Sequence, residues 1–465
     1  MPKGERTMRQ GCRGKWSVKS ALRSAIFAQA FVSASVLAAA TSPVAAQDDT
    51  TYTESVIHKF RGNPDGQSPE ADLVLDANGK IYGTTVAGGS NPDCPGGFGQ
   101  GCGTVFSLDG TGKEQVIYSF AGKPDGASSF AGLLADAAGH LYGTTALGGN
   151  VAGCYSGGGD GCGTVFKLDT SGNETVLHDF RSVFKGKPDG QSPEGVLVAD
   201  AAGNLYGTTP FGGPNSSGTI FKVHPGGSET VLYFFTGNSD GARPYSGVIR
   251  DAKGNLFGVT YFGGLSGCTG GCGTVFEFNT ASGVLTTLYA FTGQADGGNP
   301  YGGLIQDRAG NFYGTTELNG DNQCSGGNGP GCGVVFELSP AGVETVLHAF
   351  TGSPDGRNPY TRLVMDDHGN LFGTTTFGGD SSCNKGYSCG VVYEVRRTGK
   401  EIVLHAFTGG RKDGEVPYGG LVRDAAGVLY ETTVSGGTGA CSGRCGTVFK
   451  LVPTGSGGQG GTRRN

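Results

Sequence analysis

Tryptophan is nearly missing from this chain of 465 residues, and motifs that mark many enzymes are scarce as well. The only tryptophan is Trp16, beside seven histidines and three methionines. No P-loop, HExxH motif or cysteine–histidine nucleophile pattern occurs. One match to a serine nucleophile elbow, residues 237–241, lacks the strand–turn–helix context of that motif. The sequence therefore names no reaction, and the shortage of tryptophan counts mildly against a carbohydrate-binding platform.

Long apolar runs are confined to the N-terminus. Seven basic residues precede an apolar stretch from Ala25 to Ala40, and a small-residue site follows at Val44-Ala45-Ala46. This order predicts a signal peptide over residues 1–46, cleaved after Ala46. The stretch is shorter than the roughly 20 residues that a membrane span needs. We expect a secreted, periplasmic or extracellular protein with no membrane insertion after cleavage.

Basic clusters are missing from the remainder of the chain. Without the leader, 27 Lys and Arg stand against 39 Asp and Glu, a net charge near −12. An acidic surface disfavours nucleic acid, because that binding relies on neutralising phosphates. We expect a monomer with no nucleic-acid partner. Residues 47–53 are predicted to form a short linker, and the Gly-rich residues 453–465 a flexible tail.

Glycine is abundant, with 91 residues, but it recurs at fixed places in seven similar units. Each unit reads DG, a short apolar run, DxxG, a Tyr-Gly-Thr-Thr block, Gly-Gly and Gly-Thr-Val-Phe. The aromatic residue of the Tyr-Gly-Thr-Thr block stands at Tyr82, Tyr142, Tyr206, Phe257, Tyr313, Phe372 and Tyr430, at steps of 51 to 64 residues. Such regular spacing indicates turn glycines in a repeated fold rather than a disordered chain.

Each unit holds four short strand candidates and no room for a helix. In the first unit these are Ala71–Asp76, Lys80–Val86, Gly103–Asp109 and Glu114–Phe120, with a hairpin turn at residues 76–79. Four antiparallel strands at this period predict an all-β, seven-bladed β-propeller over residues 54–452, with an open β-solenoid as the alternative. A copy of the fourth strand, Glu54–Phe60, precedes the first unit. We expect it to pair with Gly446–Leu451 and close the last blade.

Twelve of the thirteen cysteines fall into six close pairs. The second member of each pair precedes the glycine of the Gly-Thr-Val-Phe run, and the third unit lacks both members at once. Loss of both together favours disulfides within loops over zinc, which needs four ligands. The predicted pairs are Cys94 with Cys102, Cys154 with Cys162, Cys268 with Cys272, Cys324 with Cys332, Cys383 with Cys389, and Cys441 with Cys445.

The repeated blocks, as in Leu205–Thr209, Gly163–Phe166 and Val346–Phe350, resemble the GloVer tandem repeat of exported bacterial proteins. The resemblance covers nearly all of residues 54–452. It implies export and a repeated β fold, but no established activity. The family often carries a C-terminal surface-sorting signal, which residues 453–465 do not resemble, so we expect release. The DxxG-N-(Leu/Phe)-Tyr element is also similar to NHL-type propeller repeats, which are mostly binding platforms.

One position, four residues beyond each DG glycine, is the candidate ligand-binding ring. By analogy with such propellers, it lies at the start of the innermost strand. Tyrosine offers a large apolar face with a polar tip, so the ring could stack on a sugar or peptide. The alternative is that these residues only pack one blade against the next. The ring consists of Glu70, Phe130, Glu194, Tyr245, Tyr301, Tyr360 and Tyr418.

Two further repeated positions have simple structural interpretations. The DG aspartates could bind Ca²⁺, but an Asp-Gly turn explains them without a metal. They are Asp65, Asp125, Asp189, Asp240, Asp296, Asp355 and Asp413. An aromatic-sized residue in the fourth strand is His58, His178, His348 or His405 in four units and Tyr118, Tyr233 or Tyr289 in the others.

Two functions remain open at this point. The first is an exported binding protein for an envelope glycan or another exported protein. The second is a calcium-dependent hydrolase or lactonase-like enzyme, in which Glu70 and Glu194 hold Ca²⁺ or act as acid and base. Regular repeats favour binding, with no catalytic residue, cofactor or metal assigned. The variable cysteine loops are the other candidate surface.

Overall fold

A computed structural model describes residues 50–454, apart from 92–93, 95–100, 151–153, 155–160, 182, 185–186, 321–323, 325–330, 381–382, 384–388, 439–440 and 442–444. The predicted signal peptide, residues 1–46, lies outside the described residues, as do residues 455–465 of the predicted tail and most of the cysteine loops. None of the described residues forms a helix long and apolar enough to cross a membrane.

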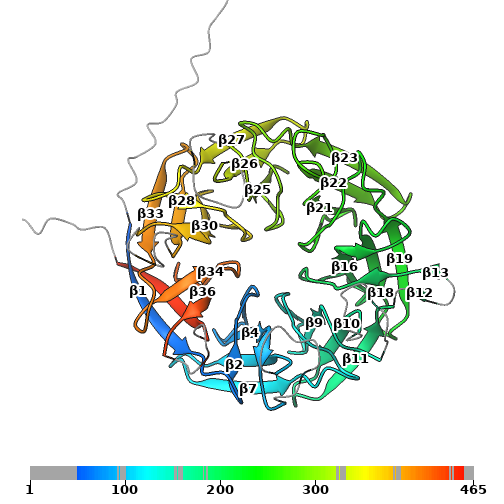
Figure 1. The fold of residues 1–465 in the computed structure, drawn as a ribbon, viewed down its shortest axis with the longest axis horizontal. Helices are drawn as coiled ribbons and strands as arrows, with labels where there is room; N and C mark the ends of the chain where they lie inside the picture. Colours follow the sequence, from blue (N-terminus) through cyan, green and yellow to red (C-terminus); the bar gives the residue numbers. More distant parts are fainter. Residues whose placement is uncertain are drawn as a thin grey trace, which may run out of the picture. The chain divides into compact units, whose positions relative to one another are not determined.

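The described residues form a β-propeller of seven blades, each a four-stranded antiparallel sheet (Figure 1). In every blade the strand that comes first in the unit is innermost and the fourth lies at the rim. From the inside outward, the first blade is β3 (Val74–Leu75), β4 (Ile81–Thr85), β6 (Thr104–Leu108) and β7 (Glu114–Ser119), the second is β8 (Leu134–Ala135), β9 (Leu141–Thr145), β10 (Thr164–Leu168) and β11 (Glu174–Asp179), and the third is β15 (Val198–Ala199), β16 (Leu205–Thr209), β18 (Thr219–Val223) and β19 (Glu229–Phe234). The fourth blade is β20 (Ile249–Arg250), β21 (Leu256–Thr260), β22 (Thr274–Asn279) and β23 (Val284–Ala290), and the fifth is β24 (Ile305–Gln306), β25 (Phe312–Thr316), β26 (Val334–Leu338) and β27 (Glu344–Ala349). The sixth blade is β29 (Val364–Met365), β30 (Leu371–Thr375), β32 (Val391–Val395) and β33 (Glu401–Ala406), and the seventh is β35 (Val422–Arg423), β36 (Leu429–Gly436), β37 (Thr447–Thr454) and β1 (Thr51–Lys59).

Short pairings attach each DG loop to the segment that follows the Tyr-Gly-Thr-Thr block. The paired strands are β2 (Gly66–Gln67) with β5 (Ala87–Gly88), β14 (Gly190–Gln191) with β17 (Phe211–Gly212), β28 (Gly356–Arg357) with β31 (Phe377–Gly378), and β34 (Gly414–Pro417) with β36. The remaining units use single bridges such as Ala127 with Leu147. A small hairpin, β12 (Val183–Phe184) with β13 (Lys187–Pro188), lies in the longer DG loop of the third unit.

The hairpin turn between the first two strands forms as predicted. The amide of Gly79 donates to the carbonyl of Asp76 at 3.0 Å, and the Asp76 carboxylate accepts from the amide of Asn78 at 2.8 Å. Gly79 has φ +78°, which suits a residue without a Cβ. The inner strand is shorter than predicted, because only Val74–Leu75 of residues 71–76 pair with the next strand. The residues before it therefore approach the axis without ladder bonds of their own.

The two ends of the chain close the last blade, as predicted. β1 runs antiparallel to β37, with Val56 opposite Phe449 and His58 opposite Val448. The paired region is longer than expected, since β1 begins at Thr51 and β37 ends at Thr454. Residues 51–53 of the predicted linker and 453–454 of the predicted tail thus belong to the closing blade.

The apolar core lies between neighbouring blades. Phe120 of one blade meets Phe166 of the next edge-to-face, with ring centroids 5.2 Å apart, and both are fully buried. Six further pairs repeat this contact, among them Phe60 with Phe106 and Phe407 with Phe449. The glycine of the Tyr-Gly-Thr-Thr block makes room for it, because a Cβ on Gly83 would lie 2.6 Å from Cζ of Phe106. The aromatic pairs are thus a structural repeat that fixes the ring of blades.

All six predicted cysteine pairs are disulfide-bonded in the described part of the chain, which confirms the prediction. Their Cα atoms lie 5.0 to 5.7 Å apart, within the usual range for a disulfide. The bonds join Cys94 with Cys102, Cys154 with Cys162, Cys268 with Cys272, Cys324 with Cys332, Cys383 with Cys389, and Cys441 with Cys445.

The second member of each pair is the more deeply buried of the two. It is fully buried in every pair, because it stands two residues before the third strand and packs into the core between blades. These buried members are Cys102, Cys162, Cys272, Cys332, Cys389 and Cys445. Each disulfide therefore ties a cysteine loop to the core. Disulfides of this number are typical of proteins in an oxidising compartment outside the cytosol.

Candidate functional site: the axial cavity

The local backbone directs one side chain per unit to the axis. In the first unit Ser68 adopts a left-handed conformation, with φ +53°, two residues before Glu70. Its amide donates to the carbonyl of Cys445, the second cysteine of the preceding unit, at 3.1 Å. The same left-handed conformation recurs in the other six units. In each, the backbone amide donates a hydrogen bond to a carbonyl of the preceding unit; the residues are Ser128, Ser192, Arg243, Asn299, Asn358 and Val416. The start of every inner strand is therefore anchored to the preceding unit, at the carbonyl of its second cysteine in six cases and of Ser217 in the seventh.

All seven residues of the predicted ring line one cavity, to which every blade contributes. Each of the seven is partly exposed. The cavity holds about 100 Å³, room for roughly three water molecules at their volume in the liquid. It is much smaller than the roughly 300–1,000 Å³ of pockets that enclose a drug-sized ligand. It can therefore enclose a small group or the end of a larger ligand.

Four tyrosines from the fourth to the seventh unit fill one side of the axis. Tyr245 stacks on Tyr301 with centroids 5.1 Å apart, and Tyr360 stacks on Tyr418 at 4.9 Å. Tyr301 meets Tyr360 edge-to-face at 5.2 Å, which joins the two stacks. These rings pack against one another and also face the cavity. The same four side chains therefore both pack between blades and line the cavity, so these two positions do not exclude each other.

Two carboxyl groups, from the first and third units, line the same cavity as this aromatic cluster. Burial raises the pKa of Glu70 to about 7. Burial and the neighbouring Glu70 charge raise the pKa of Glu194 to about 8, although Arg243 opposes this shift. Near neutral pH each of these carboxyls is therefore present in both its protonated and its ionised form. Each can donate a hydrogen bond when protonated and accept one when ionised.

The residue two positions further along each inner segment forms a second ring with a single ion pair. Asp72 of the first unit and Arg362 of the sixth meet with 3.3 Å between Oδ2 and Nη2. The amide of Gly420 donates to Asp72 at 2.6 Å. Both charged residues line the cavity. Their counterparts in the other five units are small or apolar: Gly132, Val196, Gly247, Gly303 and Gly420.

Two buried acids near the axis were not found by sequence reasoning. Glu317 accepts hydrogen bonds from the hydroxyls of Tyr261 and Tyr360, and burial raises its pKa. Glu431 is fully buried and accepts from the Thr374 hydroxyl at 3.0 Å, and burial raises its pKa well above the usual value. Glu431 replaces the glycine of the Tyr-Gly-Thr-Thr block in the seventh unit, so that break in the motif could have revealed it.

The regularity of the repeats favours binding over an enzyme in the sequence argument. The structure shows that symmetry is broken along the axis by Glu70, Asp72, Glu194, Arg362 and Glu317.

The family follows from the sequence match. The Gloeobacter/Verrucomicrobia repeat matches residues 149–327 and 323–459, which together make up more than half of the chain. The protein belongs to this repeat family. Its first two units begin before the matched residues, yet they form blades of the same kind. No curated protein matches the sequence.

Solved structures similar to this propeller repeat protein are distant in sequence. An oligogalacturonate lyase in complex with manganese is 12% identical with a TM-score of 0.50, over 88% of this chain and 96% of the lyase. The extracellular domain of a hybrid two-component system from B. thetaiotaomicron is 11% identical with a TM-score of 0.50, over 86% of this chain and 39% of that one. A gluconolactonase from Xanthomonas campestris is 12% identical, over 87% and 90%, with a TM-score of 0.38. At these identities the likeness extends to the fold alone.

The DG aspartates of the repeat stabilise turns at the junctions between blades. Asp125 accepts from the amides of Ala121 at 3.0 Å and Gly126 at 2.7 Å, and from the Tyr118 hydroxyl at 2.6 Å. Tyr233 and Tyr289 contact Asp240 and Asp296 in the same way. We call these three the Tyr junctions.

In four units a histidine takes the place of that tyrosine. Its Nε2 lies 3.2 to 3.5 Å from the aspartate of the next unit, and its ring also packs on a core phenylalanine, as His58 does on Phe60. The pairs are His58 with Asp65, His178 with Asp189, His348 with Asp355 and His405 with Asp413. We call these the His junctions. The histidine thus packs as an aromatic ring, as predicted, and in addition contacts the aspartate of the next unit.

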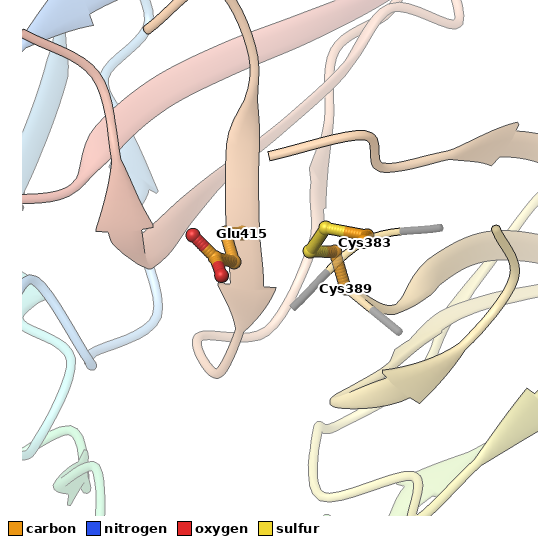
Figure 2. A group of neighbouring side chains, drawn as sticks. All are labelled: Cys383, Cys389 and Glu415. Atoms are coloured by element: carbon orange, nitrogen blue, oxygen red, sulfur yellow. A yellow bond between two sulfur atoms is a disulfide. The ribbon is translucent and has the colours of Figure 1, made fainter. Parts of the chain in front are cut away.

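One cluster with sulfur atoms is not a metal centre. Cys383 and Cys389 of the sixth unit lie close to Glu415 of the seventh unit (Figure 2). The yellow bond in Figure 2 joins the two sulfurs, so neither is a thiolate that could ligate a metal.

Proposed function

We propose that this protein is an exported binding propeller whose axial cavity takes the polar end of an envelope glycan. The observation that carries the proposal is the convergence of seven equivalent, partly exposed positions with different side chains on one cavity. Packing alone favours one residue type, as in the seven aromatic pairs of the core, where Tyr393 is the single departure from phenylalanine. The predicted signal peptide and the six disulfides support export.

The chemistry of the cavity suits hydroxyl groups. Tyr301 and its neighbours offer ring faces to the apolar face of a sugar, while Glu70 and Glu194 can donate or accept hydrogen bonds near neutral pH. The small volume restricts the enclosed part to a chain end or a single substituent. The remainder of the ligand would lie outside the cavity.

A second function is favoured by the same two carboxyls. General acid–base catalysis works best when the pKa of the catalytic group lies near the working pH, and Glu70 and Glu194 meet that condition. A hydrolase or lactonase-like enzyme at this cavity is therefore the alternative. The distant lactonase likeness adds no weight to it.

The test is a glycan array with the oxidised, purified protein, followed by titration of each glycan that binds. We expect Tyr301→Ala to weaken binding by about 1–3 kcal/mol, as for a well-packed aromatic contact residue. Glu194→Gln keeps the size of the side chain and tests the carboxyl separately. The control is Tyr233→Phe, because Tyr233 lies at a blade junction and not on the cavity.

Three outcomes decide between the candidates. Binding that falls in both axial variants but not in Tyr233→Phe supports the proposal. Release of a new product from the bound glycan would favour the enzyme. If no glycan binds, or if both axial variants bind as the wild type does, the proposed function is wrong and the cysteine loops become the candidate surface.

A further inference from the structure

Each His junction brings together three metal-ligand types from two blades. His58 comes from the outer strand β1, Asp65 from the DG loop of the next unit, and Glu114 from the outer strand β7 of that unit. The ligand atoms of each group lie within 4.8 Å of one another. The repeat thus places one nitrogen and two carboxylates at four equivalent points around the ring. The other groups are His178 with Asp189 and Glu229, His348 with Asp355 and Glu401, and His405 with Asp413 and Glu54.

The buried carboxyl oxygen of the glutamate is not explained by the fold. Oε1 of Glu114 is shielded from solvent, and among the described residues it has no hydrogen-bond partner. The same holds for Oε1 of Glu54, Glu229 and Glu401. The contact between the histidine and the aspartate involves two members of each group but leaves this third oxygen without a role. This oxygen is therefore available as a third ligand atom beside the imidazole nitrogen and the aspartate carboxylate.

Solvent reaches at least one of these groups. A cleft of about 670 Å³ is lined by His58, Asp65 and Glu114 together. An ion could therefore enter without unfolding. Arg61 and Lys113 line the same cleft and oppose a cation there, so the number of ions bound by the whole ring is a better readout than this one junction.

We propose that the four His junctions are binding sites for divalent transition-metal ions. Neutral imidazole and two carboxylates suit ions such as Zn²⁺, whereas Ca²⁺ and Mg²⁺ prefer oxygen ligands alone. Ligands on a tetrahedral zinc ion at 2.0–2.2 Å lie about 3.4 Å apart. The separations of 3.2 to 3.5 Å between imidazole and carboxylate match that spacing. A bound ion would join two neighbouring blades, independently of any ligand at the axis.

The Tyr junctions are internal controls. Tyr118 and Tyr289 occupy the histidine position, where a phenol donates to Asp125 or Asp296. The third position is kept by Glu174 and Glu344, whose Oε1 atoms are also buried without a partner among the described residues. Those two junctions therefore lack only the nitrogen ligand. The third Tyr junction differs further, because Leu285 stands opposite Phe278 where the other blades have the glutamate.

The experiment measures bound metal after chelator treatment and dialysis against Zn²⁺, with Co²⁺ as a spectroscopic probe of its ligands. We expect about four ions per wild-type chain. His58→Tyr, His348→Tyr and His405→Tyr should each remove one, and these variants should fold because three units carry tyrosine natively. His140 and His368 lie outside the clusters, so their replacement by Ser should leave the stoichiometry unchanged.

A gain of sites is the sharper test. Tyr118→His and Tyr289→His should each add one bound ion, because Asp and Glu are already in place. Tyr233→His should add none, because its glutamate is replaced by Leu285. The proposal is overturned if the wild type binds no Zn²⁺ or Co²⁺ above the triple His→Tyr variant, if Ca²⁺ binds in their place, or if Tyr233→His gains as much as Tyr118→His.

Discussion

The axis and the blade junctions are built from the same seven repeats, yet only the junctions keep equivalent residues in every unit. At the junctions every unit retains the aspartate and a ring-bearing partner, because each turn needs its amides paired and each blade needs its neighbour. At the axis the equivalent positions carry two glutamates, one phenylalanine and four tyrosines. The comparison separates residues that hold the ring from residues whose identity varies at the axial cavity.

Removing β1 is the strongest test of the junctions. Deleting residues 50–59 removes His58 and Glu54, members of two His junctions, but no axial residue. The edge of β37 is then left without its partner. We expect the unfolding free energy to fall by more than about 5 kcal/mol, a large part of the stability of a typical domain. Unchanged thermal unfolding would show that the closing strand does not hold the ring.

Asp125→Ala against Glu194→Gln compares the two regions directly. The first change leaves the amides of Ala121 and Gly126 and the Tyr118 hydroxyl without their acceptor. We expect a loss of about 3 kcal/mol, because hydrogen bonds to a charged group are involved. Glu194→Gln should not destabilise, since it removes a charge that burial disfavours. Urea unfolding measures both, and equal losses would contradict the division of roles.

The pH dependence of stability should be shared by the two regions. Burial raises the pKa of Glu194 to about 8 at the axis and the pKa of Glu229 to about 8 at a junction. A raised carboxyl pKa favours the folded state fully below the unfolded pKa of about 4.5, and this advantage is lost as pH rises through the folded value. We expect stability to fall between pH 4.5 and about 8.

Urea unfolding at several pH values, with chelator present, measures this decline. Glu194→Gln and Glu229→Gln should each flatten part of it. Burial opposes a lower pKa at Asp136 and Asp200, but hydrogen bonds lower the pKa of both to about 2. These two groups therefore change the stability only at more acidic pH, outside this window. Stability that rises with pH across this window would contradict the assignment.

The smallest expected effect is Tyr233→Phe at a Tyr junction. It removes one hydrogen bond of 3.0 Å to Asp240, which keeps its bond from the Thr236 amide. We expect a loss of about 1 kcal/mol in thermal unfolding. The variant should leave the axis unchanged, so any loss of ligand binding would mean that the junctions and the cavity are coupled.

The ring positions show how far sequence reasoning reached. Counting four residues from each DG glycine found seven of the residues that line the cavity, one from each unit, because equivalent turns bring equivalent positions to one place. It did not find the Asp72–Arg362 pair, which joins the first and sixth units past the seventh unit between them. Nor did it find Glu114 as a neighbour of His58, because the two come from the outer strands of different blades.

The sequence by itself determined the all-β repeat, the number of blades, the cysteine pairs and the closing strand, because each depends on local turn chemistry or on a pattern that recurs. Only the tertiary structure decided which units face one another across the axis, how the four tyrosines pack, and which carboxyls are buried far enough to shift their pKa values. Those properties depend on the closure of the ring. It sets distances between residues that are hundreds of positions apart, which no repeat period encodes.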